Sequence, residues 1–172
     1  AGKIFYHQGH GWAIPESGNV VRVGIDDFAQ KLVGRIDAVK FPKVGSQVAQ
    51  GKKGWSLQVA AKSIDMLSPV DGKIVAINET LISSPESISK DPYGQSWLLK
   101  VQVPKVSDNL KNLLSGGRAR KWMEGIKKNL FTRMNYNLGA VSQDGGVPVY
   151  GIARSLDSEK WDEIVKEYFL VS

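Results

Sequence analysis

Reactive side chains are scarce in this chain, and one short segment holds the amine that attracts most interest. The 172 residues contain no cysteine, which excludes disulfides, thiolate metal ligands and cysteine nucleophiles within the sequence. Residues 58–72, QVAAKSIDMLSPVDG, have the pattern of a strand, a tight turn and a returning strand. Lys62 is the only lysine of this segment. It places a primary amine at the predicted turn.

Other kinds of site find little support in the residue pattern. The two histidines, His7 and His10, would need carboxylates to complete a zinc site, and no spacing indicates such a set. The chain has no Gly-x-Ser-x-Gly nucleophile motif and no glycine-rich phosphate loop. We therefore predict that the protein is not an enzyme and binds no metal.

Composition and charge describe an ordinary globular chain with one unusual stretch. Hydrophobic residues make up 42% and charged residues 23%, which is typical of soluble domains. The net charge is +6, and residues 118–134 alone carry six basic residues and one acid. The remainder is nearly neutral, with 17 basic and 16 acidic residues. The basic character is therefore local, which argues against a general affinity for nucleic acid.

Hydrophobic periodicity predicts short strands in the first two thirds of the chain. Strands are expected near Tyr6, through Trp12 and Ile14, and over 20–24. A helix over 25–33 follows, which Asp26 or Asp27 caps and Gly34 ends. From Arg35 to Val103, further short strands alternate with glycine and proline turns, and residues 83–94 are expected to form a polar loop. This pattern favours a barrel or sandwich.

The pattern becomes helical after Pro104. We expect a short helix near residues 107–114, a hinge at 115–117 and an amphipathic helix over 118–134. A final helix begins with Asp157 as its N-cap and presents one apolar stripe that includes Trp161 and Phe169.

Several motifs in a fixed order resemble the H-protein of the glycine cleavage system, a member of the biotinyl/lipoyl carrier fold. They are Tyr6 with His10-Gly-Trp12, Val23-Gly-Ile-Asp-Asp-Phe-Ala-Gln30, Pro42-Lys-Val-Gly45, Ser68-Pro-Val-Asp-Gly72, Ile77-Asn-Glu79, Pro92-Tyr-Gly94 and Trp97-Leu-Leu-Lys100. The resemblance covers residues 6 to 114. It implies a mostly β fold with helical additions, a barrel-sandwich hybrid, and a structural role for His10.

The resemblance also implies a lipoyl attachment site, and this sequence departs from it. The family places its lysine eight residues before the proline of Ser-Pro-Val, and that position here is Ala61. Gln58 stands where the family has glutamate, Lys62 falls one place late, and Asp65 keeps the family aspartate. A shift of one residue in a hairpin redirects a side chain. We therefore interpret Lys62 as a solvated turn lysine.

These observations predict a carrier-like domain over residues 1–115 and a helical C-terminal extension over 116–172. We expect a non-catalytic module without lipoate or any other cofactor, which acts as a protein-binding or scaffold domain. The alternative is a lipoyl carrier of glycine-cleavage type that uses Lys62. The exposure and direction of the Lys62 side chain would separate the two.

The basic stretch 118–134 allows three interpretations. We favour a helix that docks its apolar stripe on the barrel or on the last helix and leaves its basic residues in solvent. The others are contact with an anionic membrane surface or with an acidic protein. The residues of this possible partner surface are Arg118, Arg120, Lys121, Lys127, Lys128 and Arg133. We expect protein partners rather than nucleic acid. We also expect a cytoplasmic location, with peripheral membrane contact as the alternative.

Overall fold

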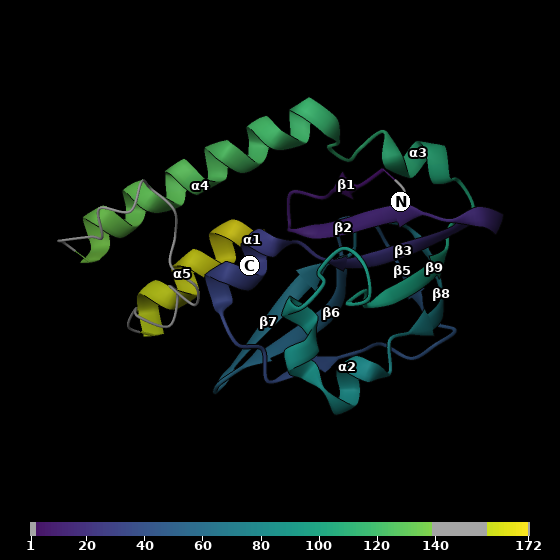
Figure 1. Cartoon of the computed structure of the whole chain (residues 1–172), viewed down its shortest axis with the longest axis horizontal. Helices are drawn as coiled ribbons and strands as arrows, with labels where there is room; N and C mark the ends of the chain where they lie inside the picture. Colours follow the sequence, from purple (N-terminus) through teal and green to yellow (C-terminus); the bar gives the residue numbers. More distant parts are fainter. Residues whose placement is uncertain (1–2, 139–157, 172) are drawn as a thin grey trace.

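The structure consists of two antiparallel sheets with helices around them: α4 runs above the sheets in the view of Figure 1, and α2 lies below them. It is a computed structural model that describes residues 3–138 and 158–171. The larger sheet has six strands in the order β1-β2-β3-β9-β8-β5, and the smaller has three in the order β4-β6-β7. The mostly β architecture agrees with the sequence prediction. The structure contains two separate sheets rather than one closed barrel.

The larger sheet begins as the sequence predicts. Its strands are β1 (Phe5–Tyr6), β2 (Gly11–Pro15), β3 (Val20–Ile25), β5 (Gln47–Val48), β8 (Gly72–Ile77) and β9 (Leu99–Gln102). β2 and β3 form the expected hairpin, with Trp12 opposite Gly24. Gly24 lies under the Trp12 ring, which a Cβ on this glycine would meet at 2.4 Å. The close approach explains why a residue without a side chain faces the fully buried indole.

The smaller sheet contains the hairpin that the sequence singles out. Its strands are β4 (Ala38–Lys40), β6 (Lys53–Val59) and β7 (Lys62–Leu67). Val59 pairs with Lys62, which leaves a two-residue turn. β4 pairs with the other edge of β6. The predicted strand–turn–strand is thus confirmed.

One predicted helix and one predicted loop can be compared with the structure in this part of the chain. The first helix is α1 (Asp27–Val33), where Asp26 is the N-cap and Gly34 has a φ of 76°. The expected polar loop over 83–94 is partly helical, because α2 (Thr80–Ser83) and a 3₁₀ turn, Pro85–Ser89, occupy its start. Ile88 supplies the physical reason, since this turn buries its side chain in the core.

Among the C-terminal helices, α3 is shorter and α4 is longer than the sequence indicates. The short helix α3 spans Val106–Leu110, and α4 spans Gly116–Leu138. The predicted hinge at 115–117 is instead the start of α4, directly after a backbone hydrogen-bonded pair between Tyr6 and Leu114. The last helix, α5 (Ser158–Phe169), begins after Asp157, and the predicted cap at Asp157 lies outside the described residues.

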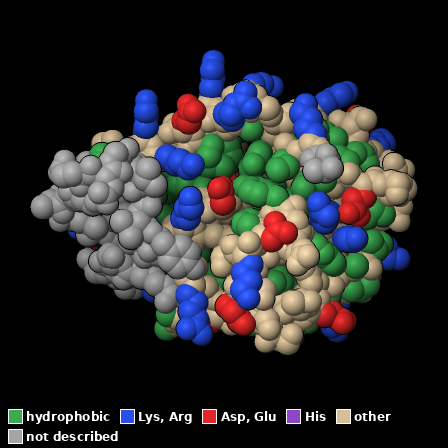
Figure 2. All heavy atoms as spheres, in the orientation of Figure 1, with side chains coloured by type: hydrophobic (Ala, Val, Ile, Leu, Met, Phe, Trp, Pro, Cys, Tyr) green, Lys and Arg blue, Asp and Glu red, His purple; other side chains and the backbone are tan. Residues whose placement is uncertain are grey.

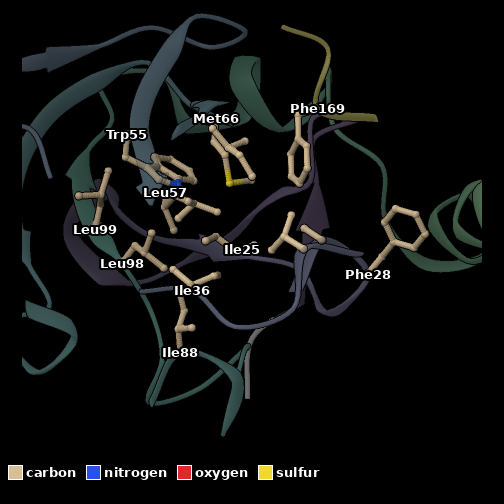
Figure 3. Close-up of a cluster of buried hydrophobic side chains, with 14 of the residues drawn as sticks. Ile25, Phe28, Ile36, Trp55, Leu57, Met66, Ile88, Leu98, Leu99 and Phe169 are labelled. Atoms are coloured by element: carbon tan, nitrogen blue, oxygen red, sulfur yellow. The ribbon is translucent and has the colours of Figure 1, made fainter. Parts of the chain in front are cut away.

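One buried cluster joins the two sheets to the helices. Figure 3 shows Trp55, Leu57 and Met66 of the smaller sheet close to Ile25 and Leu99 of the larger one. Phe169 of α5 points into the same cluster and is fully buried. Burial of such a side chain typically contributes about 1.5–3 kcal/mol. The predicted division between residues 1–115 and 116–172 stays a prediction, although α5 shares the core of the first part.

Candidate functional site

The tip of the β6–β7 hairpin is made of two small exposed residues, Ala60 and Ala61. Ala60 has a φ of 53°, a conformation that two-residue hairpin turns require and that alanine adopts at a cost. Its backbone N–H donates to the Asp37 carboxylate at 2.7 Å, which supports this conformation. Neither alanine offers an amine, so nothing at the tip itself can form an amide with an acyl group.

Lys62 is the first residue of β7 and points to the last helix. Its ammonium lies 3.1 Å from an Asp162 carboxylate oxygen and 5.3 Å from the centre of the Trp161 ring. The side chain is 32% exposed. This differs from the solvated turn lysine that we expected, because the turn ends one residue earlier and strand pairing directs the side chain towards α5.

The remaining residues of the predicted carrier segment lie along the two strands. Gln58, in β6, donates a long hydrogen bond of 3.4 Å to the carbonyl of Ala60. Asp65, in β7, accepts from the Ser56 hydroxyl at 2.8 Å and lies 3.3 Å from the Lys53 ammonium. Asp65 is therefore held by its own sheet rather than turned to the tip. The structure places the four predicted residues on one hairpin, with Ala61 alone fully at the turn.

A small groove separates β7 from α5. Its volume is about 130 Å³, and its walls include Ile64 and Asp65 of the strand and Trp161, Asp162 and Val165 of the helix. Trp161 and Val165 are buried. The last helix thus covers one side of the hairpin, and the two-alanine tip stays exposed.

His10 is a structural residue at the start of the larger sheet. It is fully buried, and its Nδ1 lies 2.7 Å from the Asp26 carboxylate. Its ring stacks between Phe28 and Trp122, with centroids 4.8 Å and 5.1 Å away. Asp26 uses its other oxygen to cap α1 at the Ala29 N–H. The pair therefore ties β2, α1 and α4 together, in line with the structural role that the resemblance implies.

His7 stabilises the turn between β1 and β2. Its Nδ1 accepts a hydrogen bond from the Gly9 N–H at 2.9 Å. Burial lowers the pKa of His7 below its ordinary value, and the nearby His10 lowers it further. The acceptor role and the lowered pKa both favour the neutral ring. Among the described residues, no group of three His, Asp or Glu side chains is placed to hold a metal ion.

The basic residues of 118–134 lie on α4 as predicted. The apolar stripe faces the body: Leu130 is fully buried, and Met123 and Ile126 pack against the core. Arg133 pairs with Glu167 of α5. Arg118, Arg120, Lys121 and Lys128 are exposed, and Lys127 is half-buried. The side chain of Met134 lies outside the described residues.

Comparison with known proteins agrees with this architecture. The sequence model of the glycine cleavage H-protein matches residues 4–126. The chain belongs to the glycine cleavage H-protein family. The H protein of Listeria monocytogenes is 38% identical over 121 residues, which are 70% of this chain and 95% of the relative. The H protein of Carboxydothermus hydrogenoformans is 36% identical over 119 residues, which are 69% of this chain and 90% of the relative.

A solved structure gives the same result for the fold. The crystal structure of the Mycobacterium marinum H protein superposes with a TM-score of 0.61 at 28% identity, over 73% of this chain and 98% of that one. Nearly the full length of each of these relatives thus aligns with about two thirds or more of this chain. The family match ends inside α4, so α5 lies beyond it.

Membership of the H-protein family has consequences for function. Members of this family normally carry lipoate on a lysine, work with other proteins and are not themselves catalytic, in agreement with the prediction that this chain is not an enzyme. In the described residues, no helix is long and apolar enough to cross a membrane. The location and the absence of nucleic-acid binding stay predictions.

The sequence alone missed the residues of α5 that reach the hairpin. Asp162 and Trp161 lie 100 and 99 positions after Lys62, and neither belongs to a recognisable motif. The apolar stripe of the last helix indicated that Trp161 would be buried. Nothing in the pattern indicated which surface would bury it.

Proposed function

We propose that this protein is an H-protein-like module that carries no lipoyl group and acts as a protein-binding or scaffold domain. The observation that carries the proposal is the two-residue tip, Ala60-Ala61, at the position where the family has its lysine. Lipoylation needs a lysine amine, and a methyl side chain cannot replace it. On this proposal the chain needs no cofactor and is a divergent member of the family.

The surroundings of Lys62 support the same proposal. The ion pair with Asp162 and the contact with Trp161 hold the amine at the side of the hairpin. An arm attached there would start beside α5 rather than at the free tip. The competing proposal, a lipoyl carrier that uses Lys62, would require this side chain to leave Asp162 and point away from the body.

The intact mass of the protein, purified from its native host, tests this proposal. The cells must lipoylate their other carriers, and the Lys62→Ala variant is expressed in the same way as a control. We expect the unmodified mass for both proteins. A lipoyl increment that is present in the wild type and absent from the variant would establish the carrier function and refute ours.

A further inference from the structure

The outward side and one flank of α4 carry a group of basic side chains. We call it the basic face and define it as Arg120, Lys121, Lys127 and Lys128. At about 100° per residue, Lys121 and Lys128 lie opposite the buried Ala119 and Leu130, whereas Arg120 and Lys127 lie on the flank of the helix between the two sides. Figure 2 shows Lys and Arg side chains projecting along the edge of the molecule that α4 occupies in Figure 1. Glu124 is the only acidic residue of the helix.

The four cations are regularly spaced. Arg120 and Lys127 are seven residues apart, and so are Lys121 and Lys128. Seven helical residues correspond to two turns and a rise of about 10.5 Å. The basic face therefore consists of two neighbouring rows, each with two cations at this separation.

These cations lack partners within the described chain. None of the four makes a side-chain hydrogen bond or ion pair with a described residue, whereas Arg133 of the same helix pairs with Glu167. Glu124 stands three or four residues from each of them and offsets one of the four charges, so the basic face keeps a net charge of +3. A surface with this excess of positive charge steers an anionic partner towards it.

A pocket adjoins the basic face and adds apolar contact surface. Its volume is about 500 Å³, and it lies between α4 and the start of the chain. Arg120 and Lys127 belong both to its wall and to the basic face, while Tyr6, Tyr93 and Met123 line its interior. The wall also contains Lys3 and one acid, Asp27, which accepts a hydrogen bond from the Tyr93 hydroxyl. Aromatic pockets with a charged rim are typical of protein hot spots.

The apolar side of α4 decides between a membrane and a protein as the anionic partner. A helix that lies in a membrane interface inserts its apolar side among the acyl chains. In this structure that side is already packed against the core, through Leu130, Met123 and Ile126. The basic face thus has no free apolar stripe to insert, which favours a protein.

We propose that the basic face and its pocket dock an acidic segment of a protein partner. Its carboxylates lie about 10 Å apart, the rise of two helical turns, and an apolar side chain between them enters the pocket. This inference rests on the proposed function and names the surface and the chemistry of the partner. It leaves the two-alanine hairpin tip outside the docking surface.

Binding of a designed probe tests the inference. The probe is a fluorescent helical peptide with glutamates seven residues apart and one leucine between the rows, and a shuffled peptide of the same composition is its control. Fluorescence anisotropy gives the affinity at several salt concentrations. The variant Arg120→Glu/Lys127→Glu is compared with Lys43→Glu/Lys90→Glu, which makes the same change in net charge at exposed lysines outside α4. The neutral variant Arg120→Gln/Lys127→Gln guards against misfolding caused by the reversed charges.

We expect tighter binding of the ordered than of the shuffled peptide, and an affinity that falls with salt. Arg120→Glu/Lys127→Glu should weaken binding at least about tenfold, or about 1.4 kcal/mol, and the neutral variant should weaken it less. The Lys43→Glu/Lys90→Glu control should change it less than about twofold, as expected for distant charges that salt screens.

Three results would overturn the inference. They are equal losses in the two charge-reversed variants, equal affinity for both peptides, and binding to phosphatidylserine vesicles through the basic face without binding to the peptide. The intact mass of the same preparation is recorded in parallel. A lipoyl increment would refute the proposed function whatever the peptides do, whereas an unmodified protein with no effect of the basic face would refute only the docking surface.

Discussion

The ammonium of Lys62 lies 3.1 Å from the Asp162 carboxylate, which joins the hairpin to a helix 100 residues later in the chain. Both side chains are a third to a half exposed. Solvent therefore screens the pair, and such pairs contribute about 0–1 kcal/mol to stability. The contact positions the amine more than it stabilises the fold.

Substitutions on the two sides of this contact should have very different effects. Lys62→Ala and Asp162→Ala should each lower the free energy of unfolding by less than about 1 kcal/mol. Trp161→Ala should lower it by about 3–5 kcal/mol, because the buried ring leaves a cavity. Urea unfolding measures all three, and Lys43→Ala is a control at an exposed lysine. A loss at Lys62 as large as that at Trp161 would contradict this assignment.

Moving the lysine by one residue should create a lipoylation site. In the double variant Ala61→Lys/Lys62→Ala, the amine stands at the exposed tip of the two-residue turn. We expect this variant to accept lipoate from a lipoate ligase, as followed by intact mass, while the wild type remains unmodified. Adding Gln58→Glu should increase the rate, because it restores the family carboxylate. Equal modification of the wild type and the double variant would show that register does not matter here.

The buried pair of His10 and Asp26 should be important for stability. Asp26→Ala leaves the fully buried His10 without its partner and removes the cap of α1. A buried polar group that loses its hydrogen-bond partner costs about 1–3 kcal/mol, and loss of the cap costs about 0.5–2 kcal/mol. Thermal and urea unfolding measure the effect. Asp108→Ala, at an exposed carboxylate, serves as the control, and similar values for the two variants would contradict the structural role.

Two glycine-to-alanine substitutions should change stability in opposite directions. At Gly24 a Cβ would lie 2.4 Å from the Trp12 ring, so Gly24→Ala should destabilise by about 1–3 kcal/mol. Gly125 is in the interior of α4 with open space around it, so Gly125→Ala should stabilise by about 0.4–1 kcal/mol. The melting temperatures of the two variants and the wild type provide the comparison. The same sign for both would refute the packing described for Trp12.

Stability should fall in mild acid because of His7. The pKa of His7 is lowered in the folded state from the ordinary value of 6.5, so below that value the unfolded chain binds more protons. The stability that the neutral ring contributes is present above pH 6.5 and is lost as the pH falls through the folded-state pKa. His7→Asn keeps an acceptor for the Gly9 N–H and removes the titration. Urea unfolding across this range should give a steeper decline for the wild type than for His7→Asn, and parallel curves would disprove it.

Local patterns in the sequence predict most of the β fold, because they report on residues close together in the chain. Alternation placed β2 and β3, and Asp26 and Gly34 marked the ends of α1. The start of β7 was harder, since a turn of two alanines has no glycine or asparagine to announce it. Lys62 was therefore assigned to the turn, although it belongs to the strand.

Long-range contacts could not be predicted in the same way. The stripe on α5 indicated burial of Trp161 and Phe169, but a stripe does not identify its partner surface. The side chains of Asp162 and Lys62 meet only because α5 packs beside β7. The prediction of a polar loop at 83–94 was wrong at its start for a related reason. Ile88 stands alone among polar neighbours, and a single apolar residue shows no helical periodicity.

The late position of α5 in the chain has a consequence for folding during translation. Lys62 and Asp162 are 100 residues apart, and translation at about 5–20 residues per second separates their synthesis by about 5–20 s. During that interval the side of β7 that Trp161 later covers has no lid, and a strand without its cover invites intermolecular association. Closing so long a loop is also slow. Synthesis and docking of α5 therefore end the period in which the nascent chain exposes this side of β7 and can associate with other chains or with a chaperone.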